Sequence, residues 1–99
     1  MITLFLILLM VSILFKLFPP KKINSFYGYR TRKSKLNDTN WKMANKYAAN
    51  LMLISIFSLL IISLTLELLN LEYDTILIGL LLLTFVIIIV LTEKKLSHR

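Results

Sequence analysis

The segment between Asn24 and Asn45 holds the polar side chains of this chain that are best suited to chemistry. Arg30 carries five N–H donors in a rigid fork, which suits a phosphate or a carboxylate group. Gly28 would permit a positive φ or a close backbone approach beside it. We therefore predict a partner- or ligand-binding cluster, and the open alternative is that Arg30 ties the segment to carbonyl groups at helix ends. The predicted cluster comprises Asn24, Gly28, Tyr29, Arg30, Thr31, Ser34, Trp41 and Asn45.

The carboxylates and the single histidine give a poor pattern for catalysis. Glu67, Glu72 and Asp74 lie close together in the sequence, and paired carboxylates can act as acid and base. Their spacing does not match a metal-binding loop, and a solvated loop that fixes topology explains them more simply. His98 has no neighbouring nucleophile, and the chain has no cysteine. We therefore expect a protein that is not an enzyme and that has no metal site and no cofactor.

Three apolar runs must position these polar residues. Met1–Phe18, Ala48–Leu66 and Thr75–Thr92 contain a single charged residue, Lys16. Each run approaches the roughly 20 residues with which a helix crosses about 30 Å of hydrocarbon. A soluble helical bundle would need polar stripes on its helices, and Leu80–Leu91 has none. The sequence therefore predicts an all-α protein with three transmembrane helices.

Local signals set the expected boundaries of these helices. Pro19 and Pro20 end the first helix, which we expect to be retained because it lacks the basic start and cleavage site of a signal peptide. Asn37, Asp38 and Thr39 are typical of a helix start. We expect one membrane domain, 1–99, made of a first transmembrane helix (about 2–18), a connector (19–38), a second helix (about 39–69, with its membrane part at 48–66), an outer loop (67–74), a third transmembrane helix (75–92) and a tail (93–99).

The charges predict the orientation of the protein in the membrane. The chain carries a formal net charge of +7, and eight of its twelve Lys and Arg residues lie between Pro19 and Tyr47. Segments rich in Lys and Arg stay in the cytoplasm, which places the connector and the basic tail inside. The acidic loop around Glu72 then lies outside. The prediction is an N-terminus outside, a C-terminus inside and a basic cytoplasmic connector between the first two helices.

The basic residues of the connector suggest a lipid contact. Lysines beside a membrane attract anionic headgroups, so we expect the bilayer itself to be one partner. Aromatic and basic residues also alternate around Tyr29, as in proteins that bind single-stranded nucleic acid. Short loops beside membranes have the same composition, so nucleic acid is not an expected partner. The predicted lipid contacts are Lys21, Lys22, Lys33 and Lys35.

One face of the second helix carries small residues. Ala44, Ala48 and Ser55 lie on this face and predict close helix packing, because small side chains let helices approach in lipid. The packing partners are either the other two helices or a second copy of the chain in a homo-oligomer. Asn50 points to the opposite face, where it can reach headgroups or a neighbouring backbone.

The sequence INSFYGYRTRKS, followed by Trp41 and Asn45 on the next helix, resembles the SdpI family of small bacterial membrane proteins. The resemblance covers about residues 19–66 and rests on an Asn, a Gly-x-Arg-Thr core, a Ser, a Trp and a second Asn. The family is named for an immunity protein that protects a cell from its own secreted toxic peptide. The resemblance implies a multi-pass protein of the bacterial cytoplasmic membrane that acts by binding.

Two kinds of binding function follow from that resemblance. One is immunity or resistance to a membrane-active peptide, and the other is signalling through a cytoplasmic protein partner at the connector. Alternatives from other classes are a small accessory or scaffold subunit of a larger membrane complex and an oligomeric transporter-like protein.

Overall fold

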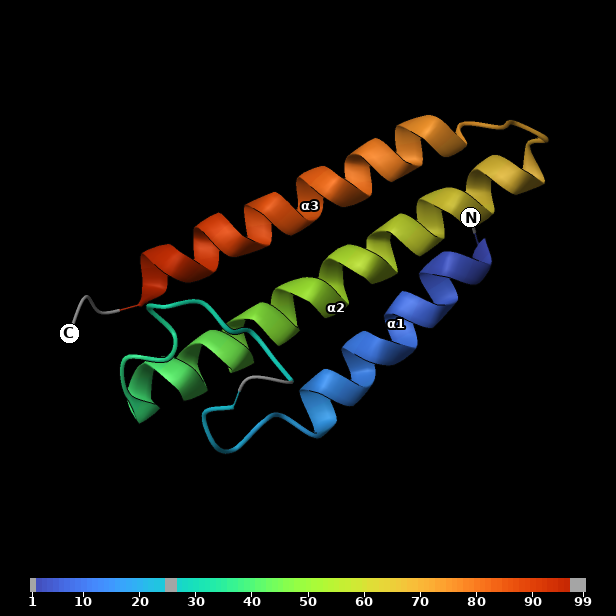
Figure 1. Cartoon of the computed structure of the whole chain (residues 1–99). Coiled ribbons are helices and arrows are strands. Elements are labelled where there is room, and N and C mark those ends of the chain that lie inside the picture. Colours follow the sequence, from blue (N-terminus) through green and yellow to red (C-terminus); the bar gives the residue numbers. More distant parts are fainter. Residues whose placement is uncertain (1, 25–26, 97–99) are drawn as a thin grey trace.

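The structure is a computed structural model that describes residues 2–24 and 27–96. It has three helices, α1 (Ile2–Leu17), α2 (Asp38–Leu68) and α3 (Asp74–Lys95). Figure 1 shows α2 between α1 and α3, and each outer helix packs along it. The connector between α1 and α2 lies at one end of the bundle, beside the end of α3. The prediction of an all-helical fold is confirmed for the described residues.

The ends of the helices follow from local sequence. α1 stops at Leu17 because Pro19 and Pro20 restrict the backbone that follows. α2 starts after Asn37, whose Oδ1 accepts a hydrogen bond of 2.8 Å from the Asn40 amide and so caps the first turn. α3 continues three residues beyond the predicted Thr92. Glu and Lys have high helix propensity, and the positive charges of lysines in a last turn stabilise the helix by interacting with its dipole.

Apolar length distinguishes the three helices. α2 has 31 residues and α3 has 22, and both are long and apolar enough to cross a membrane. Only 22% of the most apolar window of each is buried inside the protein, which is little for a core helix of a soluble domain. α1 is a shorter apolar helix of 16 residues. The fold therefore contains two helices that could span a bilayer and a third apolar helix packed beside them.

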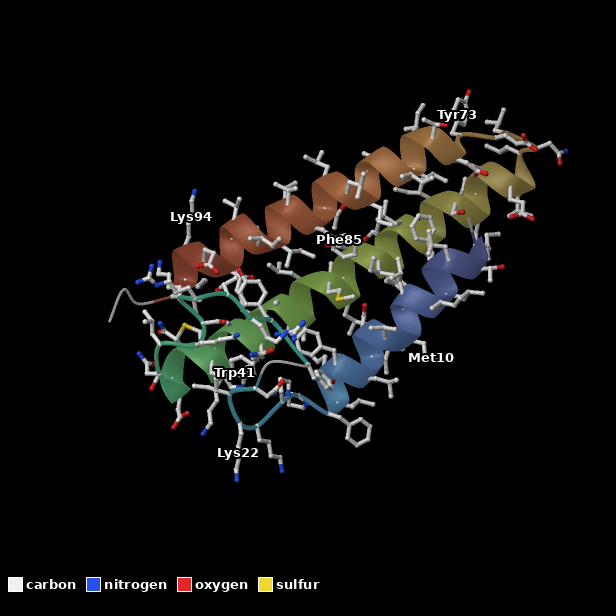
Figure 2. All side chains as sticks on the ribbon, viewed as in Figure 1. Met10, Lys22, Trp41, Tyr73, Phe85 and Lys94 are labelled. Carbon is white, nitrogen blue, oxygen red and sulfur yellow. The ribbon has the colours of Figure 1, made fainter. Side chains whose placement is uncertain are left out.

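A narrow core holds the helices together. It is centred on Phe5 of α1, Ile56 of α2 and Leu77 of α3, each almost wholly buried. Phe85 packs against this cluster, whereas Met10 points outward from α1 (Figure 2). Many other large apolar side chains of all three helices are exposed in the same way. Helices that are apolar on their outer faces suit a lipid environment.

Candidate functional site: the folded connector

Asn45 of α2 anchors the middle of the connector. Its Oδ1 accepts a hydrogen bond of 2.6 Å from the Tyr29 amide, and its Nδ2 donates to the Tyr29 carbonyl at 3.4 Å. The same Nδ2 donates to the Trp41 carbonyl at 2.9 Å, one helical turn earlier. Asn45 is 1% exposed. A primary amide carries both a donor and an acceptor, so this one side chain satisfies both backbone groups of Tyr29.

Gly28 lets the connector approach Asn45. Its φ is +102°, a backbone conformation that other residues rarely adopt. A Cβ atom at this position would overlap Asn45 Oδ1 and the ring of Pro20. Both the positive φ and the close approach that the sequence suggested for Gly28 are therefore present at once.

Trp41 joins α2 to the start of the connector. Its side chain is fully buried, and its Nε1 donates a hydrogen bond of 2.7 Å to the Pro20 carbonyl. A buried indole N–H normally finds such a partner. In Figure 2, Trp41 lies at the connector end of the bundle. Trp41 therefore holds the start of the connector on α2.

A tight turn closes the second half of the connector. Ser34 Oγ accepts a hydrogen bond of 2.8 Å from the Thr31 amide, and the Ser34 amide donates to Thr31 Oγ1 at 3.1 Å. Ser34 is fully buried. Asn40 Nδ2 of α2 donates to the Lys33 carbonyl at 3.0 Å and holds the turn on the helix. These side chains act as local partners for backbone groups that would otherwise lack them.

The two tyrosines that flank Gly28 reach opposite helices. Tyr27 OH donates to the Phe18 carbonyl at 2.7 Å, directly after α1, and also lies 3.5 Å from the Leu14 carbonyl within α1. Tyr29 OH donates to Glu93 Oε1 at 2.7 Å on α3, and Lys33 Nζ donates to the Glu93 carbonyl at 2.8 Å. Burial, and secondarily the hydrogen bond and charge of Glu93, raise the pKa of Tyr29 well above its usual value. Tyr29 is therefore a neutral donor at physiological pH, and the connector is bonded at all three helices.

Comparison with known proteins shows to which family the chain belongs. Residues 21–92 match the SdpI/YfhL protein family. The chain belongs to this family. It is similar to the uncharacterized protein YfhL of Bacillus subtilis (strain 168), with 44% identity over 91 residues, which cover 92% of this chain and 80% of the relative. No solved structure matches the chain. The resemblance noted over residues 19–66 is confirmed, and the family match extends through most of α3.

The predicted cluster of this SdpI/YfhL family member is spread over the connector and the first turns of α2. Asn24 Oδ1 accepts a hydrogen bond of 2.7 Å from the Tyr27 amide. Trp41, Asn45 and Ser34 are buried, whereas the Arg30 side chain is exposed. Ties between the connector and the helices therefore exist and involve several of these residues. Partner or ligand binding by the cluster stays a prediction.

The four lysines predicted to contact lipid lie in different surroundings. Lys33 bonds α3, Lys22 points away from the bundle (Figure 2), and Lys35 is exposed. Lys21 lines a cavity of about 500 Å³ between α1 and α2. The contact of all four with anionic lipid stays a prediction.

Sequence reasoning did not connect the lysines and Asn50 of this cavity as one site. Lys16 Nζ donates to Asn50 Oδ1 and joins α1 to α2 at its wall. Lys42 and Lys46 lie one turn apart on α2 and also line it. Their signal was present, because residues 42, 46 and 50 recur every four positions and so share one face of a helix.

The remaining predicted sites are simpler. Ala44 and Ala48 are buried and Ser55 is partly exposed, and their role in helix packing stays a prediction. At the opposite end of the bundle, Glu67, Glu72 and Asp74 line a polar hollow of about 410 Å³. Within residues 2–24 and 27–96, no group of three or more side chains is placed to hold a metal ion. His98 lies outside the described residues.

Proposed function

We propose that this chain is a three-span protein of the bacterial cytoplasmic membrane that acts by binding rather than by catalysis. Its N-terminus lies outside and its C-terminus inside, so the connector faces the cytoplasm. The function is immunity or resistance to a membrane-active peptide, or signalling of such a peptide to a cytoplasmic protein partner. Family membership and the apolar outer faces of α1, α2 and α3 support this proposal.

The observation that carries the proposal is that the connector is bonded to every helix. Asn45 fixes it to α2, Tyr27 OH reaches the Leu14 carbonyl of α1, and Tyr29 fixes it to α3. A segment held in one conformation loses little entropy when a partner binds it. A peptide that displaces one helix would also disturb the connector, because the hydrogen bonds link the two. Arg30, exposed on this ordered segment, is the proposed contact for a phosphate or carboxylate of the partner.

The orientation can be tested with single cysteines, because the chain has none of its own. We expect Glu72→Cys to react with an impermeant maleimide on intact cells and Lys35→Cys to react only after permeabilisation. Both side chains are exposed, so neither change should disturb the fold. Labelling of Lys35→Cys on intact cells would contradict the proposed orientation.

The binding role can be tested with two arginines of the same connector. Arg30→Ala and Arg32→Ala remove equal charge from exposed positions two residues apart. In cells exposed to a membrane-active toxic peptide, we expect Arg30→Ala to abolish the survival that the wild type confers and Arg32→Ala to retain it. The amount of each variant in the membrane fraction is the control. Equal protection by both variants would contradict a recognition role for Arg30.

A further inference from the structure

The cavity between α1 and α2 has two chemically different linings. Phe15, Pro19, Pro20 and Ala49 form its apolar part. Two asparagines and four lysines form the rest, namely Asn45, Asn50, Lys16, Lys21, Lys42 and Lys46. Its volume of about 500 Å³ falls within the range of about 300–1,000 Å³ that is typical of small-ligand sites.

The charge around the cavity has one sign. None of the ten described residues that line it is acidic. Four lysines line one hollow, their like charges repel one another, and a bound anion reduces that repulsion. A lysine ammonium has three donors, so Lys16 can bond Asn50 and still donate to an occupant. The occupant that fits this charge is an anion with several acceptor oxygens.

The depth of the cavity adds a second requirement. Phe15 belongs to the apolar run of α1 and Ala49 to that of α2, whereas Lys21 and Lys42 belong to the basic connector end. The cavity therefore crosses the boundary between the apolar and the basic parts of the protein. In a membrane this boundary lies at the headgroup layer. The occupant must carry an anionic group at one end and hydrocarbon at the other.

The geometry points to a binding site for the phosphate headgroup of one anionic phospholipid, with its upper acyl segment against Phe15 and Pro19. Basic pockets between transmembrane helices on the cytoplasmic side are suited to such headgroups. The inference rests on the proposed orientation, which places this end at the cytoplasmic leaflet, and it is independent of an immunity role. Free phosphate would use the lysines but would leave the apolar lining unoccupied.

The same cavity touches the residues that hold the connector. Asn45 lines it and bonds Tyr29, and Pro20 lines it and accepts the hydrogen bond of Trp41. A lipid bound here therefore packs against two supports of the connector. A ligand that binds the folded state alone stabilises it by mass action, so the bound phospholipid should also stabilise the folded connector.

The test uses the full chain in detergent with two matched pairs of substitutions. Lys42→Gln with Lys46→Gln removes two charges that line the cavity, and Arg32→Gln with Lys94→Gln removes two charges that do not line it and are not among the predicted lipid contacts; all four side chains are exposed. Native mass spectrometry measures how much phosphatidylglycerol or phosphatidylcholine each protein retains. We expect the wild type to prefer phosphatidylglycerol. The cavity pair should lose affinity for it about thirtyfold, at about 1 kcal/mol for each lysine, and the outer pair less than threefold.

Three results would overturn the inference. One is equal retention of the two lipids by the wild type. Another is an equal loss of phosphatidylglycerol affinity in the two double variants, which would mean that the lipid is attracted by the overall positive charge and not by the cavity. The third is displacement of phosphatidylglycerol by an equal concentration of glycerol phosphate, which would assign the site to a soluble phosphate. Circular dichroism checks that each variant is folded. The double variant Lys16→Gln with Lys21→Gln removes the two lysines on the α1 side of the cavity and should lose phosphatidylglycerol in the same way. A reversed orientation in the cysteine experiment would contradict the proposed function and the assignment of this site to the cytoplasmic leaflet, whereas lipid retention in detergent tests the site itself.

Discussion

The two ends of the helical bundle are closed in different ways. At the acidic end, α2 and α3 are joined by residues 69–73, and α2 ends through backbone hydrogen bonds from Leu71 to Leu66 at 2.9 Å and from Asn70 to Glu67 at 3.0 Å. This is a Schellman arrangement, with Asn70 at a φ of 56°. At the basic end, the connector follows its path because buried side chains bond its backbone. A short loop needs only a permitted backbone conformation, whereas a long one needs particular side chains.

Among the substitutions that test this contrast, Gly28→Ala should lower the free energy of unfolding the most. The strained φ alone costs about 1–3 kcal/mol, and the new Cβ also overlaps Asn45 Oδ1. We expect the free energy of unfolding in detergent to fall by about 3 kcal/mol or more, with faster proteolysis of the connector. Gly79→Ala is the matched control, because a Cβ there meets no atom within 4 Å. It should stabilise α3 by about 0.5–1 kcal/mol. Similar losses in both variants would contradict the close approach at Gly28.

Two asparagines of α2 give the next comparison. Asn45→Ala removes the partner of both Tyr29 backbone groups and should lower the free energy of unfolding by about 1–3 kcal/mol. Asn50→Ala removes a single bond to the exposed Lys16 and should cost about 0.5 kcal/mol. Chemical denaturation followed by tryptophan fluorescence measures both, because Trp41 is the only tryptophan in the chain. Equal costs would mean that the connector does not depend on the anchor.

The bond between Tyr29 and Glu93 predicts how the connector responds to alkali. The folded pKa of Tyr29 lies above the unfolded value of about 10, so the stability from the neutral tyrosine is fully present below pH of about 10. It is lost only as the pH rises further toward the folded pKa. We expect the absorbance difference between wild type and Tyr29→Phe to show tyrosinate at a higher pH than in the free amino acid.

Glu93→Gln is the control for this titration. It removes the carboxylate whose charge disfavours tyrosinate, so the titration of Tyr29 should move part of the way back toward the ordinary value. Burial, the larger cause, remains in that variant. An unchanged titration would mean that Glu93 does not influence Tyr29 and would weaken the link between the connector and α3.

The sequence predicted the helices well because their signals are local. Apolar runs, Pro19 and Pro20, and the capping residue Asn37 act within a few positions of the ends they determine. The last three residues of α3 were predicted as part of the tail, because Glu93, Lys94 and Lys95 are charged and follow the apolar run. The same residues have high helix propensity, which explains why the helix continues through them.

The site was only partly predictable because its partners are distant in the sequence. The glycine at position 28 indicated an unusual backbone conformation. Its contact with Asn45 could not be predicted, because it depends on the folded path of the connector. The bond from Tyr29 to Glu93 joins residues 64 positions apart and left no local pattern. The cavity lysines could have been found, because Lys42 and Lys46 share a face of α2, but the facing Lys16 requires knowledge of how α1 packs.

Asn70 gives the smallest expected effect and tests the acidic end of the comparison. Its left-handed backbone is tolerated by asparagine and is easier for glycine, so Asn70→Gly should change the free energy of unfolding by about 0.5 kcal/mol or less. The backbone bonds of Leu71 and Asn70 to the last turn of α2 remain available in this variant. Thermal denaturation in detergent measures the change. A loss comparable to that of Asn45→Ala would show that the acidic end also depends on a side chain, and the contrast between the two ends would not hold.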